Sequence, residues 1–311
     1  MASITLEDLH VFHAIDREIF SRLVVNLMRD PAQSMLVMAL WLWLEETNLT
    51  NIIVKMLRLS DPEVNAIANE AVSGLRSLES RTSPMPVDGG MPLTCRAMGI
   101  NISLQMLYQN KFSMISGIKT FLNNVCALIF TDILQQVFMA EPVELFNQPL
   151  VIPGFPHPTF GSITVIPQGH DYHLPLGELW GWSLNLEVPV DDRTMFLTFS
   201  RGYPVTEDEV KELFVGYFGD CVEYIQMEES TSTGQTLFAR MVVRSVSTID
   251  RILNGGYIAK FRINGKHVWA RKVEFDNKQL IDFLCRQSLP SLGIDVLIDD
   301  ILQLGGVVGV S

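Results

Sequence analysis

The sequence predicts an α+β protein in which an N-terminal all-helical domain is followed by a βαββαβ sandwich. Apolar residues recur at helical spacing over residues 1–140, whereas short apolar runs typical of strands occur between residues 195 and 275. Two of these runs flank Asn264 and Gly265, a pair that strongly indicates a β-hairpin. With 311 residues, 48% of them hydrophobic, the chain is long enough to build two cores.

Charge limits the classes of function that the whole chain can have. Its formal net charge of −12 argues against a protein that coats nucleic acid or anionic membrane through bulk electrostatics. Residues 195–275 carry equal numbers of basic and acidic residues and are the least acidic part of the chain. Any binding of nucleic acid is therefore expected to be local to this region.

Cysteine usage and hydropathy indicate where the protein resides. The four cysteines are far apart, with no paired metal-ligand spacing, and no secretory signal peptide is recognisable. We therefore expect reduced thiols in an intracellular protein of the nucleus or cytoplasm, without a metal or cofactor. The apolar run Met35–Leu44 is too short to cross a bilayer, so no membrane segment is expected.

The first 140 residues predict a compact helical domain that contacts protein partners. Thr5 and Asp8 form a capping pair at the start of an amphipathic helix. Met35–Leu44 is apolar on all sides, which is typical of the central helix of a bundle. Asp61, followed by proline, predicts the cap of another helix, and two more helices are expected before residue 140.

Two further segments flank the predicted sandwich. Residues 141–194 contain eight prolines, a density that excludes long helices and central strands. Because Phe155, Phe160 and other apolar residues there need a core to pack against, we expect an ordered connector. Residues 276–311 predict an amphipathic C-terminal tail that docks on the body of the protein or on a partner.

Each element of the sandwich has its own signal in the sequence. The strands alternate apolar and polar residues, and the helices begin at capping pairs. In order, the elements are a strand at Met195–Phe199, a helix opened by Thr206 with Glu209 and ended by Gly219, strands at Cys221–Met227 and Thr236–Val243, a helix opened by Ser247 with Asp250, and hairpin strands at Phe261–Ile263 and Lys266–Arg271.

Arg240 sets the register of the third strand. Placing Ala239, Met241 and Val243 on the core face leaves Arg240 and its neighbour Phe238 on the open face. A shift by one residue would bury the Arg240 guanidinium, which costs too much free energy. The same alternation places Val268 and Ala270 inward on the last strand and His267, Trp269 and Arg271 outward.

This order of elements, with Phe196 on the first strand and Phe238 on the third, resembles the RNA recognition motif family. The resemblance covers residues 195–275, implies a ferredoxin-like sandwich, and does not extend to the helical region. Residues Phe199–Phe218 are also similar to plant proteins of this family. Arg240 stands where the family usually has a second aromatic residue on the third strand. Gln235 or Thr236, together with Leu237, replaces the usual basic and glycine residues that begin its motif.

The resemblance implies a protein that binds single-stranded RNA on its open sheet face, with modest affinity because the module is neutral. Aromatic rings would stack on bases, and cations would pair with phosphate. The residues expected to do so are Phe196, Thr198, Phe238, Arg240, Trp269, Arg271 and Lys272.

The alternative is an adaptor whose sheet face is covered by the connector or the tail, or contacts a protein, and no longer binds RNA. An enzyme is not expected, because the sequence offers no Ser, His and Asp elbow and no Cys and His pair. No catalytic and no metal-binding residue is therefore assigned.

Overall fold

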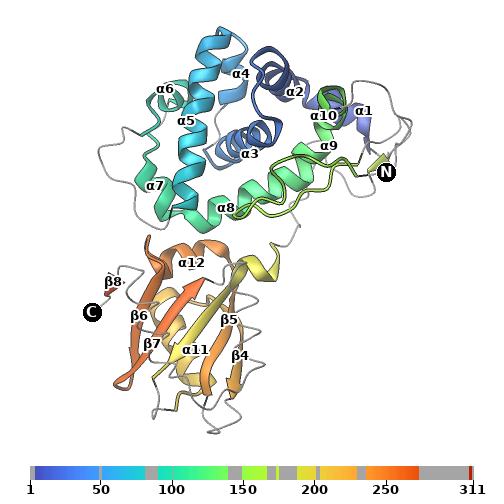
Figure 1. Cartoon of the computed structure of the whole chain (residues 1–311). Helices are drawn as coiled ribbons and strands as arrows, with labels where there is room; N and C mark the ends of the chain where they lie inside the picture. The colour runs from blue at the N-terminus through green and yellow to red at the C-terminus, as the bar shows by residue number, and fades with distance from the viewer. Residues whose placement is uncertain are drawn as a thin grey trace. The chain divides into compact units, whose positions relative to one another are not determined.

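The computed structural model describes residues 4–48, 51–80, 90–99, 101–138, 149–166, 173–174, 188–200, 204–229, 236–272 and 308–309. The fold is α+β, with a helical N-terminal region followed by an antiparallel sheet (Figure 1). Contacts divide the chain into two units, the first made of Met1–Tyr108 with Met114–Glu187 and the second of Gln109–Ser113 with Val188–Ser311.

Helices dominate the chain up to residue 138. They are α1 (Leu6–Phe12), α2 (Ala14–Ser21), the π-helical turn η1 (Arg22–Asn26), α3 (Pro31–Asn48), α4 (Ile52–Met56), α5 (Asp61–Glu79), α6 (Pro92–Met98), α7 (Leu104–Gln109), α8 (Lys111–Phe121), the π-helical turn η2 (Leu122–Cys126), α9 (Ala127–Ile129) and α10 (Thr131–Phe138). The first unit also holds a two-stranded ribbon of β1 (Ile4–Thr5) and β2 (His173–Leu174).

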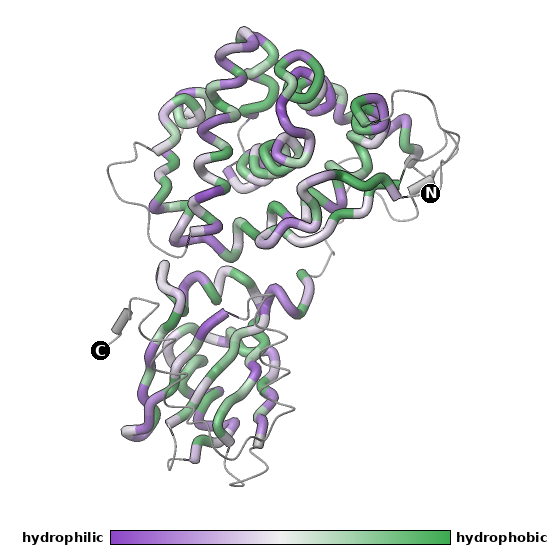
Figure 2. The backbone as a smooth tube through the Cα atoms, in the orientation of Figure 1, coloured by the Kyte–Doolittle hydropathy of each residue, from purple (hydrophilic) through white to green (hydrophobic). Residues whose placement is uncertain are grey.

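α3 is the central helix of the first unit, as its apolar sequence predicts. Every residue from Met35 to Leu42 is buried, and Trp41 is fully enclosed. Figure 2 shows the apolar character along this helix. The connector contributes to the same core, because Phe160 packs there with almost no exposed surface. Trp180 and Trp182 of the connector, and the tail apart from Val308 and Gly309, lie outside the described residues.

The predicted starts of the helices are partly confirmed. The Thr5 and Asp8 capping box opens α1. The single helix expected after it is interrupted at His13, however, and the chain continues as α2 and η1. Asp61 was the wrong cap for α5, because the preceding Ser60 forms a capping box with Glu63.

The second unit is built on a five-stranded antiparallel sheet with two helices. Its elements are the 3₁₀ turn η3 (Val190–Arg193), β3 (Thr194–Phe199), α11 (Glu207–Phe218), β4 (Val222–Glu229), β5 (Thr236–Val243), α12 (Val246–Leu253), β6 (Ile258–Ile263) and β7 (Lys266–Lys272). The strands lie in the order β4-β5-β3-β7-β6, and a short strand, β8 (Val308–Gly309), pairs with β6 in parallel.

The predicted register of the sheet is confirmed. Ala239, Met241 and Val243 have no exposed surface and pack in one core with residues of α11 and α12, including Phe214 and Ile249. Both helices therefore cover the same face of the sheet. The hairpin between β6 and β7 turns at Asn264 and Gly265, whose φ angles of 50° and 84° suit the tight two-residue turn that the sequence predicts.

The capping pair predicted for α12 is wrong. Ser245 caps this helix, and its hydroxyl accepts a hydrogen bond from the Ser247 amide. Asp250 instead accepts hydrogen bonds from the amides of Phe112 and Ser113 at 2.9 and 3.0 Å, and from the Ser113 hydroxyl at 2.5 Å. All three residues belong to the second unit, so this buried carboxylate caps the start of α8 there.

Candidate nucleic-acid interface

The face of the sheet opposite α11 and α12 carries six of the seven predicted RNA-binding residues. Pairing across β3 places Phe196 between Arg240 on β5 and Arg271 on β7. One step along the same face, Thr198 lies between Phe238 and Trp269. These six residues therefore form two adjacent rows across three central strands, because alternate residues of paired strands share a face.

The two phenylalanines form a stacked pair that Arg271 covers in part. The rings of Phe196 and Phe238 lie 5.4 Å apart between centroids, with an interplanar angle of 28°. The guanidinium carbon of Arg271 lies 5.0 Å from the centroid of the Phe196 ring. Phe196 retains only 6% exposure, whereas Phe238 is half-buried. Part of the Phe238 ring is therefore open, whereas Arg271 lies over the nearly buried Phe196 ring.

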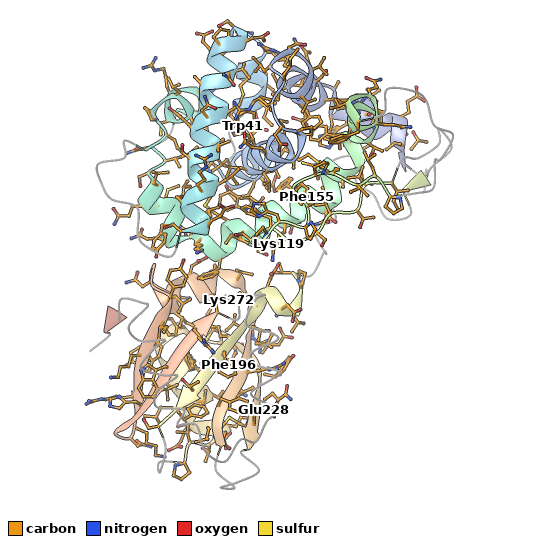
Figure 3. The ribbon with its side chains drawn as sticks, viewed as in Figure 1. Trp41, Lys119, Phe155, Phe196, Glu228 and Lys272 are labelled. Carbon is orange, nitrogen blue, oxygen red and sulfur yellow. The ribbon has the colours of Figure 1, made fainter. Side chains whose placement is uncertain are left out.

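Lys272 lies elsewhere than expected. It is the partner of Met195 across β3, and so belongs to the row of the core face at the end of β7. Its ammonium group donates hydrogen bonds to the carbonyl oxygens of Asp191 and Thr194, at 2.5 and 3.3 Å. Figure 3 shows Lys272 and Phe196 on their neighbouring strands. In this structure Lys272 ties the start of β3 to the end of β7.

The sequence interpretation placed His267 and Trp269 outward but did not single out the cations beside them, Lys260 and Arg262. The Lys260 ammonium lies 5.6 Å from the centroid of the Trp269 ring, and the centroid of the His267 ring also lies 5.6 Å from it. Arg262 pairs with His267 across the hairpin. Alternation along β6 places Lys260 and Arg262 on this face. The strand predicted from the sequence began only at Phe261, so it left out Lys260 and was too short to show the alternation.

These residues form a positively charged region, which we call the Trp269 cluster and define as Lys260, Arg262, His267 and Trp269. Partial burial and the nearby charges of Lys260 and Arg262 lower the pKa of His267. Strands β6 and β7 contain no acidic residue. Among the described residues, no carboxylate forms an ion pair with Lys260 or Arg262.

The opposite edge of the sheet is acidic. Glu228 on β4 lies across from Phe238 and accepts a hydrogen bond of 2.9 Å from the amide of Gln226. β4 and β7 are separated by β5 and β3, which corresponds to about 14 Å between the two strands. This exceeds the Debye length of about 8 Å at physiological salt, so Glu228 does little to neutralise the Trp269 cluster. Glu228 and Phe196 are labelled in Figure 3.

A buried arginine that the sequence analysis did not single out holds the start of β3. Arg193 donates hydrogen bonds to the carbonyl oxygens of Val188 and Val243, at 3.1 and 2.9 Å, and pairs with the carboxylate of Glu223. Since β3 carries Phe196 and Thr198, Arg193 positions the strand at the centre of the candidate interface.

Among the described residues of the first unit, the titratable groups form no cluster like the one around Trp269. Burial is the main reason that the pKa of Glu45 rises to about 7, with a smaller contribution from the charge of Asp16. His13 is buried and pairs through Nδ1 with Asp16 at 2.6 Å. Within the described residues, no group of three or more His, Cys, Asp or Glu could hold a metal ion.

One helical stretch, Lys111–Ile129, is long and apolar enough to span a membrane. Half of this window is buried in the protein, as in the core helix of a globular protein. A membrane-spanning helix and the core helix of a globular protein share this length and composition, so the stretch by itself does not indicate contact with a membrane.

Comparison of the chain with protein families, with curated proteins and with solved structures gave no match. Function is therefore inferred from the residues and their geometry.

Proposed function

We propose that the second unit is a recognition-motif fold that binds single-stranded RNA on its open sheet face. The order of elements β3, α11, β4, β5, α12, β7 supports this assignment, because it corresponds to βαββαβ with β6 added as the first strand of a hairpin. The sheet order β4-β5-β3-β7 supports the same assignment, because it puts the first and third strands of the motif side by side at the centre.

The observation that carries the RNA proposal is the set of aromatic rings on this face. Phe238 and Trp269 lie in one row on either side of Thr198, and both are partly exposed. Flat rings stack on unpaired bases of any sequence, and each stacked base contributes about 1–3 kcal/mol. The adjoining cations would pair with phosphate. Since the proposed stacking involves the two partly exposed rings of Phe238 and Trp269, we expect modest affinity and a short binding site.

The test is a titration of the full-length chain with a fluorescent pool of short single-stranded RNAs at low salt, followed by anisotropy. Phe238→Ala should weaken binding about 5- to 150-fold, which corresponds to the loss of one stacked base. Tyr217→Ala is the matched control, because Tyr217 is an aromatic residue on α11 with 55% exposure. It should bind RNA as the parent does. Absence of saturable binding by the parent would overturn the proposal.

One observation favours an adaptor as the second candidate. Phe196, which would be expected to stack on a base, is almost fully buried beneath Arg271 and beside Phe238. If the face binds a protein, the Phe196 and Phe238 pair would form the apolar part of that contact. The titration separates the two candidates, because an adaptor would not bind the RNA pool at low salt.

A further inference from the structure

We propose that RNA bound to the second unit follows the hairpin of β6 and β7, with a base stacked on Trp269 and successive phosphates on Lys260 and Arg262. This inference rests on the proposed function and deepens it by locating the strand and its main phosphate contacts. It places the main phosphate contacts in the Trp269 cluster, beside the row that Phe238 and Trp269 share.

The first step concerns which ring can receive a base. Phe196 is enclosed by Phe238 and Arg271, whereas Trp269 is half-buried and has Lys260 over its ring. The lysine side chain is flexible, so its ammonium can leave the ring for a nearby phosphate while a base takes its place. The exchange replaces a cation–π contact with a stacked base and an ion pair.

The second step concerns phosphate. Lys260 and Arg262 lie on one face of β6, two residues apart, so their Cα atoms are about 7 Å from each other. That spacing is comparable with the separation of successive phosphates in an extended strand. No ion pair holds either side chain among the described residues, so neither must break one to bind.

The third step concerns where phosphate is disfavoured on this face. Phosphates near β4 would meet Glu228, whose carboxylate lies beside Phe238 and repels them. His267 belongs to the same cluster, and among the described residues its buried Nδ1 has no hydrogen-bond partner.

The experiment measures how the affinity of the full-length chain for the RNA pool depends on salt. The double variant Lys260→Gln with Arg262→Gln should make the slope of log K against log salt shallower by about 1.4, since each phosphate contact contributes about 0.7 for a single strand. The matched control is Lys211→Gln with Arg58→Gln, which removes the same charge at exposed positions on α11 and in the first unit. The control should keep the parental slope.

A second variant tests the base. Trp269→Leu should weaken binding of the RNA pool about 5- to 150-fold but leave binding of inorganic polyphosphate unchanged. Equal binding of RNA by Trp269→Leu and the parent would overturn the stacking contact, and a parental salt slope in the Lys260 and Arg262 variant would overturn the phosphate contacts. In either case the proposed function would stand if Phe238→Ala still lost affinity. A parent that binds no RNA would overturn both.

Discussion

The guanidinium carbon of Arg271 lies 5.0 Å from the centre of the Phe196 ring, so the arginine side chain lies over this aromatic residue of the central strand, β3. The two residues are also partners across β3 and β7, so backbone pairing holds them in place. The contact changes which residues of these two rows can serve as binding positions, because Phe196 is nearly buried whereas Phe238 and Trp269 keep part of their ring surface exposed.

We predict that this contact stabilises the pairing of β3 with β7. Arg271→Gln should lower the local free energy of opening by about 0.5–1 kcal/mol, the usual size of a cation–π contact near the surface. Hydrogen exchange of the β3 and β7 amides, followed by mass spectrometry, measures this as an acceleration of about two- to fivefold. Arg262→Gln is the control, since Arg262 covers no aromatic ring among the described residues. Equal exchange in both variants would contradict the assignment.

The carboxylate of Asp250 should be more important for stability than the sequence pattern around it suggests. Asp250→Ala removes three hydrogen bonds and leaves two amides of α8 unpaired, so it should lower the free energy of unfolding of the second unit by about 2–3 kcal/mol. Ser247→Ala, which tests the capping pair predicted from the sequence, should change it by less than about 0.5 kcal/mol. Urea denaturation of both variants measures the difference. A larger effect of Ser247→Ala than of Asp250→Ala would contradict this assignment and favour the capping pair predicted from the sequence.

Two helical glycines should respond in opposite ways to the same substitution. A Cβ added at Gly117 would lie 2.0 Å from atoms Cδ1 and Nε1 of Trp43, so Gly117→Ala should destabilise the first unit by about 1–3 kcal/mol. A Cβ at Gly216 in α11 meets no atom within 4 Å. Gly216→Ala should therefore stabilise the second unit by about 0.5–1 kcal/mol, through the loss of backbone freedom in the unfolded chain. Thermal unfolding of the two variants shows the sign of each change.

Glu45 should make the first unit less stable as the pH rises. Its pKa is raised from 4.5 to about 7, mainly by burial, so the folded state favours the protonated carboxyl. The stabilisation is complete below about pH 4.5 and is lost as the pH approaches and passes about 7. After allowance for solvent screening, we expect a loss of about 1–2 kcal/mol between pH 5 and 8.

Glu45→Gln should flatten this part of the pH profile while retaining an oxygen for the Ile53 amide, which lies 2.8 Å from the Glu45 carboxylate. Glu46→Gln makes the same change of charge at an exposed neighbour and should leave the profile as it is. Denaturation at a series of pH values measures both. A parental profile in Glu45→Gln would assign the pH dependence to another group.

RNA binding should strengthen as the pH falls below about 6.5, if the Trp269 cluster binds phosphate. Burial, Lys260 and Arg262 lower the pKa of His267 in the free protein, so it is neutral at pH 7. A phosphate bound beside these cations offsets their charge and raises the pKa, so binding takes up a proton. Anisotropy titrations between pH 8 and 5.5 should show the increase, and His267→Gln should abolish it. His157→Gln, in the first unit, should retain it.

Much of the second unit could be predicted from local patterns. The strand Thr236–Val243, the Thr206 capping box and the turn at Asn264 and Gly265 all follow from short stretches of sequence, and the structure has each of them. The register of β5 also followed, because only one alternation keeps the Arg240 guanidinium out of the core. These features depend on residues within a few positions of one another, where backbone geometry restricts the choices.

The sequence by itself determined which residues alternate onto the open face, since strand geometry has a period of two. Only the tertiary structure decided which partners the polar side chains take: Arg271 lies over Phe196, Lys272 binds two carbonyl oxygens, and Asp250 caps α8 rather than α12. The physical reason is reach. A long side chain, or a buried carboxylate, takes the partner that folding brings within about 3 Å, and that partner can lie more than a hundred residues away in the chain.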